Sequence, residues 1–206
     1  GCDSLRMYEL FVGPPELDAE WDDRGIDGVN RFLKRLWTLL MDSKDQDIEA
    51  TKEMIKLRHR MVYDVTTRLE NFSLNTVISG FMEYNNKFIE LAKKEGGIDK
   101  ETLETIAVLI SPFAPHFAEE MWEQLGHTET VFKAGWPAYD EEAMKDDEIQ
   151  IPVQINGKTK AVVSIPAEAS KEEAIAAGKE AIAGKLTGNV VKEIYVPKKI
   201  INIVMK

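Results

Sequence analysis

The spacing of apolar residues changes once along this chain of 206 residues. Between residues 26 and 125 they recur every three or four positions, a pattern that begins at Val29, Phe32 and Leu33 and is typical of amphipathic helices. From Ile151 onward apolar and polar residues alternate, which is typical of strands that bury one face. The change of period predicts two successive domains. The predicted fold class is α+β, with an N-terminal helical bundle followed by a small β-β-α-β-β domain.

The helical part is predicted to be a bundle of four or five helices with short loops. Gly96 and Gly97 end the third helix, and Asp99 is a suitable N-cap for the fourth. Pro112 and Pro115 interrupt that fourth helix, because proline lacks the backbone N–H and clashes with the preceding turn. The predicted helices run over 26–41, over 47–69, from Ser73 to the glycine pair, from Asp99 to the prolines, and over 115–125.

The second part has the signals of a small sheet with one helix. Asn156 and Gly157 lie between two alternating runs, which predicts a hairpin with a tight turn. Ser170 and Glu173 have the spacing of a capping box and predict the start of a helix. The predicted elements are strands 151–155 and 158–165, a helix over 171–183, and strands 190–196 and 200–204.

The net charge of −10 is unevenly distributed along the chain. Residues 149–206 contain nine Lys and five Glu, a net charge of +4, whereas residues 1–148 contain 17 basic and 31 acidic residues, a net charge of −14. An acidic run over 140–148 joins the two parts and predicts a solvated linker. The predicted segments are therefore 1–22, 23–139, 140–148 and 149–206.

Residue patterns of catalysis or metal binding are missing from the sequence. It has no glycine-rich phosphate loop, and none of its three histidines has a carboxylate or a second histidine at metal-ligand spacing. Ser111 and His116 are interpreted as part of a bend between helices rather than a nucleophilic pair. We predict no catalytic residue and no metal site. Trp136 is expected to fold back as a plug over the bundle.

Basic residues cluster at helical spacing and at the turns of the small domain. Such clusters can follow a phosphate backbone by charge. For the helices, the alternative interpretation is a solvated, salt-bridged face, which spacing alone favours. For the hairpin, the turn geometry alone accounts for Asn156 and Gly157. The candidates are Arg31, Lys34 and Arg35; Lys52, Lys56, His59 and Arg60; and Asn156, Lys158, Lys160, Lys198 and Lys199.

Several stretches, taken in order, resemble the bacterial leucine–tRNA ligase family. The clearest block, 111–116 with 119–122, is shared with the valine and isoleucine relatives of that family. Resemblance to the leucine enzymes in particular rests on 152–158 and on 194–197 with 202–204. The remaining similar stretches are Gly1 to Arg6, Leu10 to Pro15, Trp21 with Gly25 and Gly28, Arg31 to Trp37, Phe72 to Val77, and Phe81 to Asn86.

The resemblance implies a role for each segment. Residues 1–22 would be a connecting stem from a catalytic core, 23–139 a helical anticodon-binding domain of the class Ia type, and 149–206 a small tRNA-binding domain. The complete enzyme would use ATP and Mg²⁺ to activate leucine and attach it to tRNA(Leu). This region, which lacks both class I signatures and holds no cofactor, would be a non-catalytic fragment that holds the tRNA body.

The expected partners are tRNA(Leu) and the catalytic core of the same polypeptide, in an enzyme that is monomeric. No apolar run is long enough to span a membrane, and one cysteine, Cys2, cannot form an internal disulfide, so the expected compartment is the reducing cytoplasm. Lys160 stands where the family usually has Arg, and Lys198 stands where Gly is expected. These two departures leave a bidentate phosphate contact and the geometry of one turn in doubt.

Two alternatives to the leucine interpretation remain open at this point. One is the equivalent region of a valine– or isoleucine–tRNA ligase, which should lack the hairpin domain that contains Asn156 and Gly157. The other is a helical protein-interaction module without RNA binding, which predicts an exposed apolar patch on the bundle and no salt-dependent affinity for tRNA.

Overall fold

A computed structural model describes residues 1–14, 17–18, 20–22, 24–145, 148–185 and 188–206. It divides the chain into two compact units, Gly1–Met144 and Lys145–Lys206. The division falls within the acidic run predicted as a linker. Several residues on which predictions fell lie outside the described residues. They include Pro15 in the first predicted segment, Asp23 at the start of the second, and Asp146 and Asp147 in the linker.

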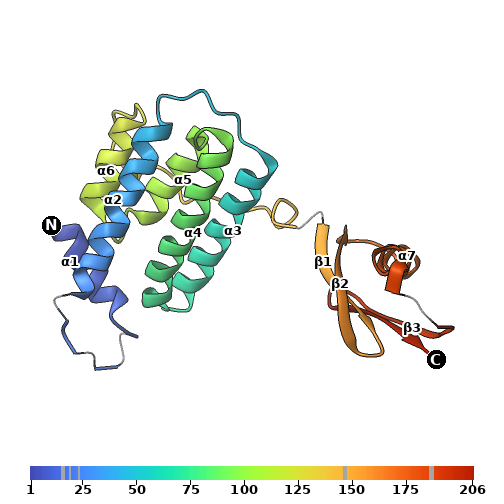
Figure 1. Ribbon diagram of the computed structural model, residues 1–206. Coiled ribbons are helices and arrows are strands. Elements are labelled where there is room, and N and C mark those ends of the chain that lie inside the picture. Colours follow the sequence, from blue (N-terminus) through green and yellow to red (C-terminus); the bar gives the residue numbers. More distant parts are fainter. Residues whose placement is uncertain (15–16, 19, 23, 146–147, 186–187) are drawn as a thin grey trace. The chain divides into compact units, whose positions relative to one another are not determined.

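The first unit is a helical bundle (Figure 1). All the predicted helices are present, and the structure adds one at the N-terminus, within the segment predicted only as a stem. Among the described residues, none of the helices is long and apolar enough to cross a lipid bilayer. The helices are α1 (Cys2–Phe11), α2 (Gly25–Ser43), α3 (Lys52–Glu70), α4 (Leu74–Glu95), α5 (Lys100–Ile110) and α6 (Pro115–Gln124).

Side-chain and backbone caps decide where these helices begin and end. The predicted start of α3 at Asp47 is wrong, because the Thr51 side chain accepts a hydrogen bond from the Met54 amide at 3.3 Å and caps the helix there. Helix α4 ends at Gly96, which has a φ of 87°. The predicted interruption by prolines is confirmed, because α5 ends at Ile110 and α6 begins with Pro115 in its first turn.

Helix α1 packs on the bundle through its buried Met7 and Tyr8. The Tyr8 ring lies against the start of α2, where a Cβ on Gly25 would be only 2.4 Å from it. At the other end of α1, the buried Asp3 carboxylate accepts a hydrogen bond from the Phe117 amide at 2.7 Å, in the first turn of α6. This carboxylate caps α6, whose own N-cap residue, Ala114, has no side chain that can accept a hydrogen bond.

The second unit is a four-stranded sheet with one helix on one of its faces. The strand order is β2-β1-β4-β3, so the first and last strands of the domain are parallel neighbours at its centre. Glu148 was predicted to belong to the linker but is the first residue of β1, where it pairs with Pro166. The elements are β1 (Glu148–Ile155), β2 (Lys158–Pro166), α7 (Lys171–Ala181), β3 (Val190–Val196) and β4 (Ile200–Met205).

Candidate nucleic-acid interface

Three basic side chains stand on the outer face of α2. Arg31, Lys34 and Arg35 are all exposed, and none has an ion-pair partner in the part of the chain that the structure describes. The opposite face of the same helix buries Phe32 and Leu33 in the core. The predicted exposure of this group is therefore observed without ion pairs among the described residues, and its contact with RNA stays a prediction.

The second predicted group, on α3, is more closely engaged with the protein. Lys52, Lys56 and Arg60 each interact with other residues of the protein. Lys56 and Arg60 line a groove of about 380 Å³ between α3 and α4. His59 is half-buried, and its Nδ1 accepts a hydrogen bond from the backbone N–H of Asp140 at 3.1 Å. This contact with a distant part of the chain was not predicted.

Helix α4 contributes lysines that the sequence analysis did not single out. Lys87 and Lys94 line the α3–α4 groove, whereas Lys93 and the predicted Arg35 line a second groove, of about 510 Å³, between α2 and α4. The exposed Lys94 donates hydrogen bonds to the carboxylates of Glu53 and Glu95, which raises its pKa. The spacing of Lys87 and Lys94, seven residues apart, was the available signal, because such residues share a helix face.

Arg58 lies among these basic residues in the sequence but has a different role. Its side chain is buried, and its guanidinium pairs with Asp99 at 3.2 Å and with Glu101 at 3.0 Å. Asp99 in turn accepts hydrogen bonds from the backbone and the side chain of Thr102 at the start of α5. This network joins α3 to the N-terminus of α5 and is structural.

In the small domain, the predicted hairpin turn is observed at Asn156 and Gly157, whose φ angles are 50° and 80°. Both polar atoms of the Asn156 side chain are hydrogen-bonded to the backbone of Met205. Oδ1 accepts from the Met205 amide at 2.8 Å, and Nδ2 donates to the Met205 carbonyl at 3.2 Å. Gly157 N donates to Asn202 Oδ1 at 3.2 Å. The turn role of Asn156 is therefore visible, and its amide is not available to RNA without breaking these bonds.

The predicted lysines of this domain are all exposed. Beside Lys160 lies Lys185, which was not predicted and whose Nζ donates to the Lys160 carbonyl at 2.8 Å. Lys198 has a φ of 58°, which explains why glycine was expected there, and its Nζ lies 3.6 Å from Glu168. Lys158 is the first residue of β2, directly after the hairpin turn. Lys199 lies in the other turn, directly before β4.

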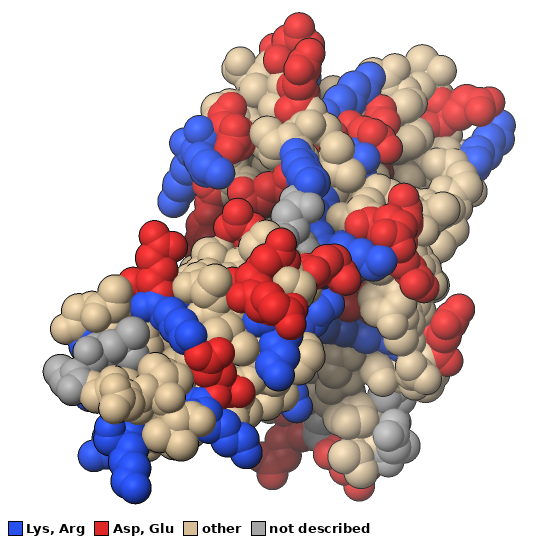
Figure 2. Space-filling view, turned by 90° about the vertical axis from the view of Figure 1, so that its right-hand side faces the viewer, with Lys and Arg blue, Asp and Glu red and all other residues tan. Residues whose placement is uncertain are grey.

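The charge on the surface is mixed. On the face shown in Figure 2, Lys and Arg are interspersed with Asp and Glu rather than gathered into one continuous patch. Binding to either unit would therefore depend on individual basic side chains rather than on one large patch.

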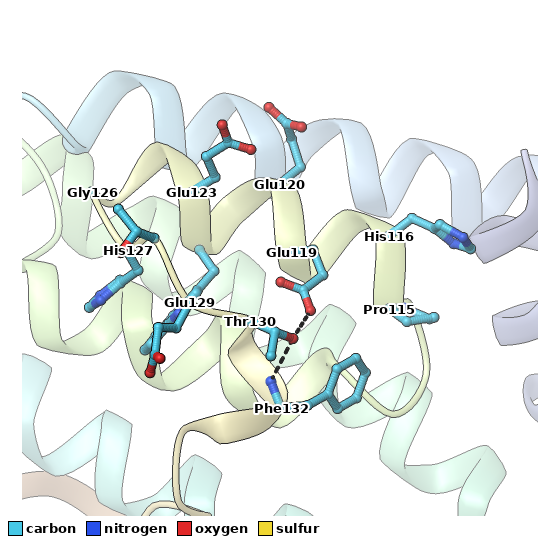
Figure 3. A pocket seen from close by; sticks show the side chains of 12 residues that line it. Pro115, His116, Glu119, Glu120, Glu123, Gly126, His127, Glu129, Thr130 and Phe132 are labelled. Atoms are coloured by element: carbon cyan, nitrogen blue, oxygen red, sulfur yellow. Dashed lines mark hydrogen bonds between the residues drawn. The ribbon is translucent and has the colours of Figure 1, made fainter.

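The hollow on α6 has the wrong charge for a phosphate backbone (Figure 3). It measures about 970 Å³, and its lining includes Glu120, Glu123 and Glu129. Glu119 points to the loop after the helix, where it accepts hydrogen bonds from the Thr130 hydroxyl and from the Val131 amide. We exclude this hollow from the candidate interface.

Ser111 and His116 do not form a nucleophilic pair. Ser111 Oγ donates to the Val108 carbonyl at 2.9 Å, and His116 Nδ1 lies 2.9 Å from Asp3 Oδ1.

His116 does have potential metal ligands nearby in space, because ligand atoms of Cys2, Asp3 and His116 lie within 4.8 Å of one another. The separation of these residues in sequence concealed this group. Trp136 does fold back onto the bundle, as expected, because its indole N–H donates to Thr66 of α3, but it is 43% exposed and covers the bundle only shallowly.

Comparison with known proteins identifies the family of the chain. Residues 51–175 match the family model described as the anticodon-binding domain of tRNA ligase. The chain is 44% identical to a leucine–tRNA ligase of Fervidobacterium nodosum, with 100% of the chain and 27% of the relative covered. It is 42% identical to a leucine–tRNA ligase of Phocaeicola vulgatus, with 100% and 22% covered. The chain therefore spans about a quarter of the length of these relatives.

A solved structure shows a similar fold. It is the ternary complex of LeuRS of Agrobacterium radiobacter K84 with tRNA and LeuAMS, and it covers 100% of this chain and 28% of its own with a TM-score of 0.77 and 26% identity. The likeness includes both the helical bundle and the small sheet domain. The valine and isoleucine alternative predicted that this sheet domain would be missing, and the leucine relatives cover it completely.

Proposed function

This chain belongs to the anticodon-binding domain family of tRNA ligases, and we propose that it is the tRNA-holding region of a leucine–tRNA ligase. The observation that supports this most directly is the exposed group of Arg31, Lys34 and Arg35 on α2, in a fold like that of a LeuRS solved with tRNA. Because these cations have no partner among the described residues, phosphates can neutralise them without first breaking an ion pair.

The complete enzyme would use ATP and Mg²⁺ to activate leucine, and would attach it to tRNA(Leu) for translation. The present region would contribute binding and orientation, with chemistry left to a catalytic core in the same polypeptide. We place the enzyme in the cytoplasm and expect it to be monomeric.

The two units would hold the RNA by backbone contacts rather than by base reading. In the bundle, the proposed contacts are Arg31, Lys34 and Arg35, with Lys56, His59 and Arg60 on α3. In the small domain they are Lys158, Lys160, Lys198 and Lys199, while Asn156 would act by holding the shape of the hairpin.

The test is binding of the chain to a leucine tRNA transcript across a salt series. A variant with Arg31→Ala, Lys34→Ala and Arg35→Ala should bind less tightly, and the slope of log affinity against log salt should fall by roughly one per lost phosphate contact. The matched control is Lys100→Ala with Lys133→Ala, since these exposed lysines are already paired with Glu104 and Glu129. Equal slopes in the two variants would contradict the proposed interface.

A protein-interaction module is the remaining alternative, and the same titration separates it from RNA binding. For such a module, the titration would show no affinity for tRNA that depends on the salt concentration. Failure of the chain alone to bind, followed by binding once the catalytic part is restored, would instead show that the contacts need the complete enzyme.

A further inference from the structure

The segment that leaves the bundle lies back along α3. We call this segment, residues 136–140, the strap. The Trp136 indole N–H donates to Thr66 Oγ1 at 2.9 Å, and the Tyr139 ring packs edge-on against Tyr63 with centroids 5.1 Å apart. The backbone N–H of Asp140 donates to His59 Nδ1, as described above.

The partners of the strap form one stripe on α3. Thr66, Tyr63 and His59 are spaced by three and four residues, so their side chains share a face of the helix. The strap runs antiparallel to α3, because its first residue contacts the C-terminal member of the stripe and its last contacts the N-terminal member. Seating the strap therefore fixes the chain at His59, a few residues before the small domain begins.

The seat of the strap is shallow. The Trp136 and Tyr139 side chains are 43% and 40% exposed, and Tyr63 is 39% exposed. The strap residues, all of them described, make two hydrogen bonds and one ring pair with α3, and neither Trp136 nor Tyr139 belongs to the buried core. The strap can therefore leave α3 without opening the bundle.

The same stripe continues toward two lysines of α3, of which Lys56 is a proposed RNA contact. Lys52 and Lys56 precede His59 by seven and three residues, which places them on the same side of α3. With the strap seated, the Asp140 amide occupies the Nδ1 edge of the His59 ring, so that only its Nε2 edge remains for a phosphate. Asp140, whose backbone contacts this ring, is also an exposed acidic residue, and its negative charge opposes the approach of a phosphate.

We propose that the strap and an RNA phosphate backbone compete for this stripe, so that RNA binding along α3 releases the strap. This inference rests on the proposed tRNA-holding function. Release frees five residues, which adds at most about 17 Å to the tether of the small domain. The bundle would thus control how far the small domain can reach, and it would extend that reach only when RNA occupies α3.

The test follows the Trp136 indole N–H by NMR in the whole chain, with the resonance assigned from a Trp136→Phe variant. Thr66→Val removes the acceptor and gives the position of the released indole without RNA. Thr67→Val, one residue along the helix, is the matched control, because no side-chain hydrogen bond of Thr67 exists among the described residues. Leucine tRNA transcript is then added, and binding is recorded separately by fluorescence anisotropy.

We expect saturating tRNA to move the wild-type resonance to the position seen in Thr66→Val. We also expect Thr66→Val to bind tRNA about fivefold more tightly, the equivalent of one hydrogen bond that no longer has to be broken, and Thr67→Val to bind like the wild type. Binding that leaves the indole at its original position would overturn the strap proposal and leave the proposed function standing. Absence of binding in the anisotropy titration, both for the chain alone and once the catalytic part is restored, would refute the proposed function itself.

Discussion

The helical bundle and the small sheet domain present their basic residues in different ways. In the bundle, Arg31, Lys34 and Arg35 project from a helix whose position is set by buried residues on its other face. In the small domain, basic residues sit in or beside turns whose backbone conformation depends on particular residues, such as Asn156 and Lys198 with their positive φ angles. Substitutions on α2 therefore test binding alone, whereas substitutions at these turns test folding as well.

The two regions also differ in what holds them together. The bundle has a core that includes large buried side chains such as Phe88, Met54 and Met121. The buried core of the small domain consists of isoleucine and valine with a single alanine, Ala174. Since stabilisation scales with buried apolar area, the bundle should tolerate the loss of a surface contact better than the small domain does.

The largest effect on stability is expected from a buried polar network inside the bundle, although the bundle has the larger core. Arg58→Ala leaves the buried Asp99 without its guanidinium partner, which should lower the free energy of unfolding of the bundle by about 3–5 kcal/mol. Urea unfolding followed by helical circular dichroism would measure it. Arg60→Ala, two residues along the helix and exposed, is the control and should change stability by less than about 0.5 kcal/mol. Similar values for the two would mean that the Arg58 network does not hold α3 to α5.

The second-largest effect on stability is expected in the small domain. Asn156→Ala removes two hydrogen bonds to Met205 and places alanine at a φ of 50°, so the small domain should lose about 2 kcal/mol of stability. Hydrogen exchange of the β4 amides would detect this loss while the amides of α2 stay unchanged. Lys158→Ala, two residues away, removes an exposed charge and serves as the control. Equal protection of β4 in the two variants would show that the Asn156 contacts contribute nothing measurable.

Local patterns predicted most of the secondary structure, because helical and strand periods, caps and turns are properties of short segments. The period of three to four residues located α2 to α6, and the Asn156-Gly157 pair located the hairpin. The order of the sheet was beyond such patterns, because β1 and β4 become neighbours through contacts between the two ends of the domain. Helix α1 was also missed, because Met7 and Tyr8 are buried only through packing against the rest of the bundle, which no local pattern reveals.

The candidate site shows the same division between local and distant information. The position of Arg31, Lys34 and Arg35 on an exposed helix face followed directly from their spacing. The partners of His59 and Lys160 did not, because Asp140 and Lys185 approach them from distant parts of the sequence. Residues at helical spacing were placed correctly, while the question of which of them were already engaged needed the tertiary structure.

The smallest effect concerns Lys198, where the turn between β3 and β4 places a lysine in the left-handed region. Its neighbour Lys199 donates its amide to the Val196 carbonyl at 3.1 Å, and Pro197 precedes it in the turn. A turn with proline second and a positive φ third favours glycine in the third position. Lys198→Gly should therefore stabilise the small domain by about 1 kcal/mol, because relief of backbone strain exceeds the added entropy of the unfolded chain.

Thermal unfolding of the Lys198→Gly variant should show a higher Tm for the small domain and an unchanged Tm for the bundle. The matched control, Lys199→Gly, lies next to it without a positive φ and should destabilise the turn instead. If Lys198→Gly also weakens tRNA binding while it raises the Tm, the charge of Lys198 has been retained at a cost in stability, which is the pattern expected of a binding residue. A rise in Tm with unchanged tRNA affinity would remove Lys198 from the interface and leave Lys158, Lys160 and Lys199 as its contacts in the small domain.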